Sequence, residues 1–390
     1  MANTFKFGNG KWAVKDGYAL AYNDENGNFK PLPFDFTRAS SATRVNKDGL
    51  IEVVTNNKPR IDFLNDSNGA LLLEPQRTNL VIYSNDFTNG SWSKSAAGTG
   101  TIPILTSNYG ISPDGLQNAS RMQMNLNGGV SGGDISYLTY FLTSIAPATN
   151  SVYLKSLGSD ATMTFRCGST FKSILVTSGW QRFDVTSASG TDRLQLLLYG
   201  NSDSQSADLL IYGASLEQGS YPTSIINTSG STVTRVADNA YQQSVTQVIG
   251  QSEGTMFIEF IPKDSSTLQI LYQAKSSSGV VGQIDIRLLS GLIRALANDG
   301  GGSQFFINGG SYAVGTKYKV AIRYKLNDSK LYINGTDSGS DTSCSFTGSS
   351  LDQVSFADSL SSHLPSVDII DSRLYNTALS DSELQALTQV

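Results

Sequence analysis

Residues able to carry out covalent or metal chemistry are scarce in this chain. His363 is the single histidine, and Cys167 and Cys344 are the two cysteines. Any Ser-His-Asp or Cys-His mechanism would have to use His363, which lies in the polar stretch SSHLP. A histidine in such a turn is typical of a solvent-exposed loop. Zinc requires three or four nitrogen or sulfur ligands, and these three residues fall in separate parts of the chain. We therefore predict no catalytic residues and no zinc site.

Phosphate and calcium motifs are also missing or incomplete. No GxxxxGK[ST] sequence occurs, and the stretch Asp299-Gly-Gly-Gly302 is not followed by a helical pattern. The stretch DSGSD at 337–341 is similar to a calcium loop. It lacks the glycine at the sixth position and the terminal glutamate that an EF-hand loop requires. A calcium ion held by scattered loop oxygens stays open, and no pattern locates it. We predict no other cofactor.

Paired carboxylates are the enzymatic route that composition leaves open. Glycoside hydrolysis uses two carboxyl groups about 5–10 Å apart. With 33 acidic residues, some pair will satisfy any search. Many of these residues lie in turns, such as Asp24-Glu25, Asp48 and Asp114, where solvation or turn capping explains them. The sequence therefore favours a protein that is not an enzyme.

The composition favours an all-β protein. Only 16% of the 390 residues are charged and 37 are glycine, a balance typical of β-sandwiches with many tight turns. The length predicts two or three domains, because single cores rarely grow past about 250 residues. The net charge of -5 argues against a nucleic-acid or anionic-membrane partner. We expect neither an export signal nor a membrane span, no disulfide, and assembly in a reducing cytosol.

Periodicity places two β-rich bodies in the chain. Short strands with Gly, Ser and Asn turns predict a two-sheet jelly roll over 81–222, and the clearest are at 152–154, 162–165, 173–176, 182–185, 194–199 and 209–212, the last ending before Gly213. Strict alternation in TMFIEFIP and a hairpin at 319–335 predict a second sandwich over 251–390, with Leu326 on the inward face of the strand 319–326. The capping box Ser380-Asp-Ser-Glu383 predicts a short C-terminal helix. The expected fold is all-β, with two antiparallel jelly-roll or β-sandwich domains in tandem, an N-terminal docking segment and this helix.

Three further segments complete the expected organisation. Residues 223–250, rich in Ser and Thr, are predicted to be an extended linker. Residues 36–80 are predicted to form a β-rich collar. Residues 1–35 are rich in aromatic side chains but too short for a core of their own, so they should pack either on the rest of this chain or on a partner. As a docking arm, this segment would use Phe5, Phe7, Trp12, Tyr18 and Tyr22.

Two groups of side chains allow both a structural and a functional interpretation. Trp92 and Trp180 fall at strand starts, where they would fill the core or form a platform on which sugars stack. Four arginines in 36–80 lie among Ser, Thr, Asn and Asp. Such arginines usually bind carboxylates or backbone carbonyls, and the functional alternative is a site for an acidic ligand. They are Arg38, Arg44, Arg60 and Arg77.

Several of these stretches together resemble a known class of protein. The block TRASSATRVNKDGLIEVV…PRIDF…LLLEPQRTNLVIYSNDF is similar to one that recurs in fibre and virion structural proteins of tailed bacteriophages. GWQRFDV and GASLEQGSYPTSIINTSGSTVTRVAD resemble parts of the carbohydrate-binding-module-like jelly roll that follows it there. GTMFIEFIP, KVAIRYKLNDSKLYING and DSRLYNTALSDSELQALT are similar to a laminin-G-like or concanavalin-like sandwich. The resemblance covers about residues 36–388 and includes the head fibres of crAss-like phages.

This resemblance implies a virion structural protein, assembled in the host cytoplasm and located on the particle. It would be a homo-oligomeric head or tail fibre, dimeric or trimeric, held to capsid or tail proteins by its N-terminal region. Its projecting sandwiches would bind host-surface glycans weakly and through many copies. A soluble lectin or glycan-degrading protein is one alternative, and a capsid decoration or cement protein without a ligand is another. Head or tail placement and the identity of any glycan stay open.

Overall fold

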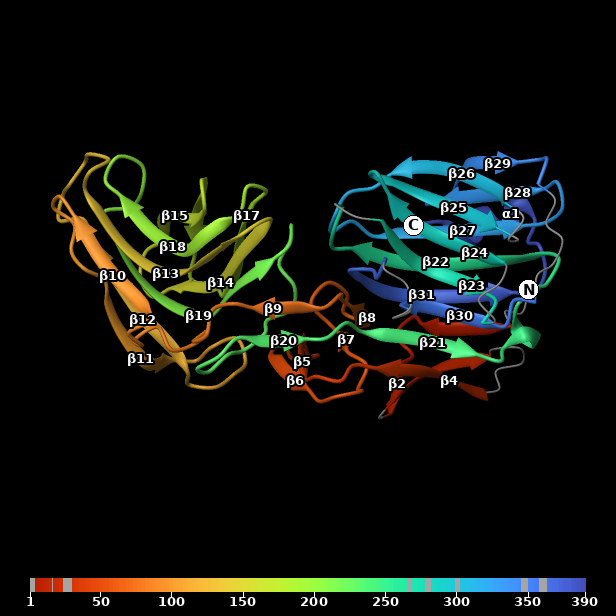
Figure 1. Cartoon of the computed structure of the whole chain (residues 1–390), viewed down its shortest axis with the longest axis horizontal. Coiled ribbons are helices and arrows are strands. Elements are labelled where there is room, and N and C mark those ends of the chain that lie inside the picture. Colours follow the sequence, from red (N-terminus) through yellow and green to blue (C-terminus); the bar gives the residue numbers. More distant parts are fainter. Residues whose placement is uncertain are drawn as a thin grey trace. The chain divides into compact units, whose positions relative to one another are not determined.

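The computed structural model describes residues 4–15, 17–23, 30–265, 268–277, 282–298, 302–344, 350–357 and 363–390. Within them the regular secondary structure is almost entirely β-strand, with one short α-helix at the C-terminal end, so the predicted fold class is confirmed (Figure 1). No helix in these ranges is long and apolar enough to cross a membrane. The chain forms two compact units. One comprises 1–48, 53–76 and 236–390, and the other 49–52 and 77–235.

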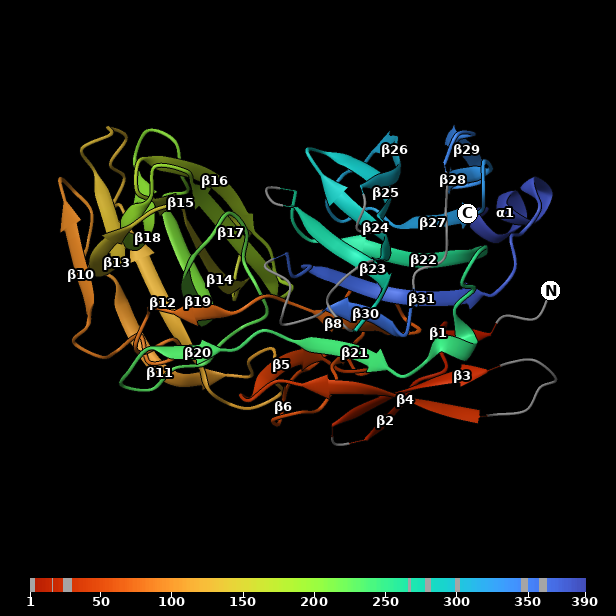
Figure 2. The ribbon, with the colours of Figure 1, turned by 45° about the vertical axis from the view of Figure 1, so that its right-hand side comes forward.

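The first unit is a β-sandwich with two antiparallel layers (Figure 2). In one layer β22 lies between β31 and β27, and β27 continues to β28 and β29. β31 also pairs with β1 and with β8, which pairs with β7. The bounds are β1 Phe5–Gly8, β7 Ile61–Asp62, β8 Ala70–Leu73, β22 Gly254–Pro262, β27 Tyr318–Tyr324, β28 Ser329–Ile333, β29 Thr336–Asp341 and β31 Val367–Tyr375.

The other layer runs β26-β25-β24-β23-β30-β21-β4-β3-β2. A pair between β1 and β3 joins the two layers. Its strands are β2 Ala13–Lys15, β3 Tyr18–Asn23, β4 Lys30–Thr37, β21 Asn239–Gln243, β23 Gln269–Lys275, β24 Gln283–Leu289, β25 Leu292–Asn298, β26 Ser303–Ser311 and β30 Gln353–Ala357. A two-stranded ribbon is formed by β5 (Ala42–Val45) and β6 (Ile51–Val54).

Alternation along β22 shows why these residues form this sandwich. Met256, Ile258 and Phe260 enter the main core between the layers. Phe257 points to the opposite face, where Leu384 of helix α1 (Asp381–Thr388) covers it. Ser380 caps that helix: its hydroxyl accepts from the Glu383 amide, and the Glu383 carboxylate accepts from the Ser380 amide. The capping box predicted from sequence is therefore confirmed, and β22 is buried on both faces.

The second unit is a jelly roll of two five-stranded antiparallel sheets, β10-β13-β18-β15-β16 and β11-β12-β19-β14-β17. Most consecutive strands cross from one sheet to the other, and the apolar core lies between them. A ribbon of β9 and β20 completes the unit. The bounds are β9 Arg77–Asn79, β10 Trp92–Ala97, β11 Ile104–Gly110, β12 Ala119–Asn125, β13 Ile135–Ile145, β14 Ala148–Ser156, β15 Ala161–Cys167, β16 Thr170–Val176, β17 Gln181–Ser187, β18 Thr191–Tyr199, β19 Ser206–Gln218 and β20 Val233–Arg235.

The segment expected to be a linker, 223–250, is ordered and divided between the units. Ile225 and Ile226 are buried in the second unit, and β20 pairs with β9 there. From Val236 on, the chain belongs to the first unit, where β21 pairs with β4 and β30. Few apolar residues are needed for this order, because backbone pairing and Ser/Thr hydrogen bonds hold much of the segment. The units also differ from the predicted boundaries, since 1–48 and 53–76 join 236–390 in one sandwich.

Candidate ligand-binding groove

A polar groove of about 830 Å³ opens on the second unit. Its volume is in the range of small-molecule sites. Five segments line it: the loop between β9 and β10, the end of β11, the loop between β11 and β12, β19, and the segment that leads into β20. The lining residues are Tyr83, Asn85, Asp86, Thr88, Ser107, Asn108, Asp114, Asn118, Tyr212, Asn227, Thr228, Ser229, Ser231 and Val233.

A bulge in β19 places Tyr212 in this groove. Leu209 and Ile211 point into the core, and so do Ala214 and Leu216, so one extra residue interrupts the two-residue period. The register of β19 against β14 shifts at this position. Gly213 occupies it with a φ of +66°, a backbone conformation that glycine adopts at little cost. A Cβ there would lie 2.3 Å from Ile225 Cδ1. The bulge therefore requires glycine, and it keeps Tyr212 on the outer face of the sheet.

Asp114 organises the loop between β11 and β12 at the bottom of the groove. Its Oδ1 accepts from the Ser112 hydroxyl and from the Leu116 amide at 2.9 Å. Its Oδ2 accepts from Asn118 Nδ2 and from the Tyr212 hydroxyl, each at 2.9 Å. Partial burial would raise the pKa of Asp114, but these hydrogen bonds outweigh it and hold the pKa below its usual value. The carboxylate is thus ionised and its two oxygens accept four hydrogen bonds.

The pKa of the neighbouring Tyr212 phenol shifts in the opposite direction. Burial and the negative charge of Asp114 raise the pKa of Tyr212 well above its usual value. Tyr212 therefore stays protonated and donates to Asp114. A general acid for glycoside hydrolysis needs a raised carboxyl pKa and a proton free to leave. Asp114 has neither property, so the groove suits binding better than hydrolysis.

The other wall is formed by two segments that clasp each other. The Ser84 amide donates to the Thr228 hydroxyl at 3.0 Å, and the Thr228 amide donates to the Ser84 hydroxyl at 2.9 Å. Beside them, Asn85 Oδ1 accepts from the Gly213 amide at 2.8 Å, and Asn85 Nδ2 donates to Asn227 Oδ1 at 3.1 Å. The clasp fixes the backbone, which leaves the exposed Asn227 side chain at the edge of the groove.

The surface offered to a ligand is rich in short polar groups. Ser107, Asn108, Ser229 and Ser231 are exposed hydroxyls and an amide, and Tyr83 supplies a half-buried aromatic ring. Asn118 Oδ1 is buried at the groove without a hydrogen-bond partner. Amides and hydroxyls around one aromatic ring complement a molecule that has several hydroxyl groups and an apolar face. The arrangement therefore fits a saccharide.

Sequence reasoning did not assemble this groove. Asp114 was singled out only as a turn carboxylate, and the structure confirms that it caps a turn. The lining residues come from five segments and share no motif. Gly213 was the available signal, because a glycine inside an apolar strand often marks a bulge.

The aromatic residues predicted to dock on a partner are placed differently. Phe5 and Phe7 are 1% and 0% exposed and pack in the core of the first unit. Trp12 packs against the same core, with its ring 5.3 Å from that of Phe7. The side chains of Tyr18 and Tyr22 are not among those described. Of the two interpretations, packing on the rest of the chain accounts for the first three residues, and docking by this segment stays a prediction.

The two tryptophans also have mainly structural contacts and do not form a platform at the groove. Trp92 is 1% exposed and contacts Phe87 and Tyr140 in the core of the second unit. Trp180 is half-buried, and its Nε1 donates to the carbonyl of Ile111 at 3.1 Å. Neither lines the groove.

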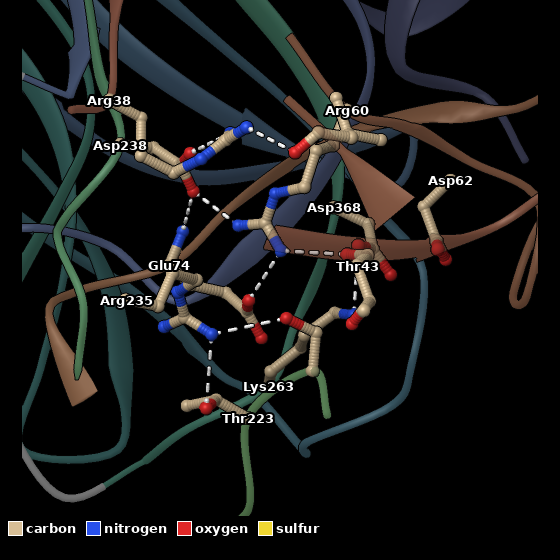
Figure 3. A network of polar contacts seen from close by, with 12 residues as sticks. Arg38, Thr43, Arg60, Asp62, Glu74, Thr223, Arg235, Asp238, Lys263 and Asp368 are labelled. Carbon is tan, nitrogen blue, oxygen red and sulfur yellow. Dashed lines mark hydrogen bonds and ion pairs between the residues drawn. The ribbon is translucent and has the colours of Figure 1, made fainter. Parts of the chain in front are cut away.

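Arg38 and Arg60 belong to a buried ionic cluster in the first unit, shown in Figure 3. Arg38 Nη1 donates to Asp238 Oδ1 at 2.9 Å, and Arg60 binds both Glu74, at 2.8 Å, and Asp238. Burial would lower the pKa of Arg60, but the charges of Asp238 and Glu74 raise it overall. Arg44 donates to the carbonyl of Ile61 at 3.1 Å. The structural interpretation is confirmed for Arg38, Arg44 and Arg60. Arg77 lies in β9 of the second unit, with its guanidinium over the Tyr221 ring at 5.0 Å.

The remaining candidates do not converge. His363 is half-buried ahead of β31, and its carbonyl accepts from the Ile270 amide at 3.1 Å. Cys167 and Cys344 are both buried and free. Among the described residues, no three His, Cys, Asp or Glu side chains are grouped to hold a metal ion. Calcium binding therefore stays open.

Comparison with family profiles and with curated protein sequences gives no match. Solved structures resemble parts of the chain. They include a sialidase CBM40 of Ruminococcus gnavus bound to α2,3-sialyllactose (18% identity, 38% of this chain and 91% of that chain, TM-score 0.33). Domain 4 of a GH43 arabinanase from Geobacillus stearothermophilus, in complex with arabinotriose, is another (15%, 44% and 83%, TM-score 0.33). A pentraxin of Limulus polyphemus is a third (11%, 34% and 68%, TM-score 0.28). Similarity this low carries no argument about ligand or activity.

Proposed function

We propose that this chain is a non-catalytic glycan-binding protein whose saccharide site is the groove of the second unit. The observation that carries the proposal is the composition of the groove: hydroxyls, side-chain amides and the Tyr83 ring surround a space of about 830 Å³. One of its two lining carboxylates, Asp114, accepts four hydrogen bonds and is held ionised. Asp114 can therefore help to shape a saccharide site but is not the proton donor for cleaving a saccharide.

The wider setting we propose is the surface of a tailed-bacteriophage particle. The motifs of residues 36–388 support it through their resemblance to phage fibre and virion structural proteins. In that setting the chain is a homo-oligomeric head or tail fibre. A site with millimolar affinity is sufficient there, because many copies on one particle raise the effective affinity by about 10²–10⁴.

Binding is tested on a glycan array, followed by titration calorimetry with the strongest saccharide. Tyr83→Ala is expected to abolish binding, because it removes the more exposed of the two aromatic rings that line the groove. Phe171→Ala is the matched control, since Phe171 is 51% exposed on β16, in the sheet that does not carry Tyr212. Loss of binding in the control but not in Tyr83→Ala would move the site to that other sheet. A reducing-sugar assay that shows turnover would refute the non-catalytic assignment.

The virion setting needs its own test. Immunogold labelling of purified particles, or a low-resolution image of them, would locate the chain on head or tail. Removing residues 1–35 is not a clean test of docking, since β1 pairs with β31 and its phenylalanines fill the core. Removing these 35 residues is expected to unfold the first unit. Absence of the chain from purified particles would refute the setting and leave the glycan-binding proposal standing.

A further inference from the structure

The charge of the groove restricts which saccharides it can take. None of its lining residues, all within the fully described stretch 77–235, is Lys, Arg or His. Two of them are carboxylates. Asp114 is held ionised at the bottom, and Asp86 is exposed at the edge. A ligand in the groove therefore meets negative charge with no lining cation to offset it.

Three cations lie near the groove on the same sheet without lining it: Arg121, Arg182 and Lys155, the last on β14 opposite Leu210. Arg121 lies opposite Leu210, one outward-facing position before Tyr212 on β19. It binds Asp208 with both Nε and Nη2, at 2.7 and 2.5 Å, and its guanidinium lies over the Tyr109 ring at 4.9 Å. A bidentate ion pair leaves little charge to attract a second carboxylate. Arg121 is therefore a poor substitute for a lining cation.

Arg182 lies on the other side of Tyr212 and is held by an aromatic ring. The Tyr153 ring lies 6.3 Å from the Tyr212 ring, and Arg182 stacks over Tyr153 at 5.5 Å. Arg182 Nη2 also donates to the Ser151 hydroxyl at 3.0 Å. Neither Arg182 nor Tyr153 lines the groove. Because none of these cations lines the groove, the charged side chains of the lining itself are all negative.

We infer that the groove selects neutral or amine-bearing saccharides and rejects those that carry a carboxylate, such as sialic or uronic acids. This inference rests on the proposed function and specifies its ligand class. A like-charge contact inside a partly enclosed site acts against the wrong ligand more strongly than an added hydrogen bond favours the right one. We expect acidic saccharides to bind at least about tenfold more weakly than their neutral counterparts. This gap in affinity between acidic and neutral saccharides should shrink at high ionic strength, because salt screens exposed charge.

The test is an array, followed by calorimetry, of neutral oligosaccharides printed beside the same chains carrying a terminal sialic or uronic acid. Asp86→Asn is the informative variant. Oδ1 of Asp86 accepts from the Thr88 hydroxyl at 2.7 Å and from the Thr88 amide at 3.2 Å, and asparagine can accept both. The loop should therefore keep its shape while the charge is removed. Asp160→Asn, an exposed carboxylate of the same unit outside the groove, is the control.

The results separate this inference from the proposal on which it rests. Support requires that neutral members bind, that acidic members bind at least tenfold more weakly, and that Asp86→Asn but not Asp160→Asn narrows the gap. Acidic members that bind equally well or better, with binding still lost in Tyr83→Ala, would overturn the inference and leave the proposed function intact. A gap unchanged in Asp86→Asn would also overturn it. Binding of neither class at millimolar concentration would overturn both.

Discussion

Replacing Asp238 by asparagine should destabilise the first unit strongly. Asp238 is fully buried. Its Oδ1 accepts from Arg38 at 2.9 Å, and its Oδ2 accepts from Arg60 and from the Glu74 amide. Asparagine has nearly the same shape but no charge and only one acceptor oxygen. Arg38 and Arg60 would both lose their ion pair with Asp238, whereas the pair between Arg60 and Glu74 would remain. Breaking a buried ion pair by removing one partner costs about 3–5 kcal/mol.

The magnitude follows from what remains of the cluster. Arg38 keeps its hydrogen bonds to the carbonyls of Ser40 and Thr55, and Arg60 keeps those to Glu74 and Thr43. These contacts limit the loss of stability, so we expect the free energy of unfolding to fall by about 4 kcal/mol. For a unit of this size, 1 kcal/mol shifts the melting temperature by about 2–4 °C. The expected fall is therefore about 8–16 °C.

Differential scanning calorimetry and urea unfolding followed by intrinsic fluorescence measure this effect. Glu253→Gln is the control, because its ion pair with Lys325 spans 3.5 Å between side chains that are 38% and 47% exposed. Such surface pairs contribute about 0–1 kcal/mol. A loss below 1 kcal/mol in Asp238→Asn, or a loss equal to that of the control, would refute the reasoning about the cluster.

Three further predictions concern single positions. Gly213→Ala should destabilise the second unit by several kcal/mol and weaken saccharide binding, since a Cβ would clash with Ile225 Cδ1; calorimetry and titration would show both. Ser380→Ala should cost about 1 kcal/mol in urea unfolding by removing the cap of α1, and Ser382→Ala should cost less. Hydrogen bonds from the amides of Thr99 and Ser131 lower the pKa of Asp134 from 3.8 to about 2. Its contribution is present above pH 4 and is lost as the pH falls toward 2, so Asp134→Asn should flatten the acid limb of the unfolding profile.

The all-β fold could be predicted because its evidence is local. Six strands of the jelly roll were visible as short apolar runs between turns, and each lies within an observed strand. The helix at Asp381–Thr388 follows from its capping box alone. Leu326 was expected to continue the inward face of the strand at 319–326, but it is 56% exposed because β27 ends at Tyr324. Strand ends depend on the turn that follows, which periodicity does not encode.

Long-range pairing could not be predicted in the same way. The arginines at 38 and 60 were expected to bind carboxylates, yet their shared partner Asp238 lies about 200 positions further along the chain than Arg38. For the same reason β1 appeared to be part of a separate arm, whereas it completes a sandwich built mostly from 236–390. Composition indicates what kind of partner a residue needs but not where in the chain that partner is.

The groove could not be predicted from the sequence for a related reason. Gly213 looked like the end of a strand at Tyr212, but β19 continues to Gln218 through a bulge. That bulge decides which side chains face outward. The loops that meet Tyr212 include one that lies far away in the sequence, since Asp114 is 98 positions before Tyr212, and their residues are ordinary turn residues.

A crystal structure of this protein soaked with the strongest neutral saccharide from the array tests the central claim most directly. The account predicts density for the saccharide in the groove, in contact with Tyr83, Asn118 and Asn227, and no such density in crystals of Tyr83→Ala. Density over the other sheet of the jelly roll, or on the first unit, with the groove empty would contradict it.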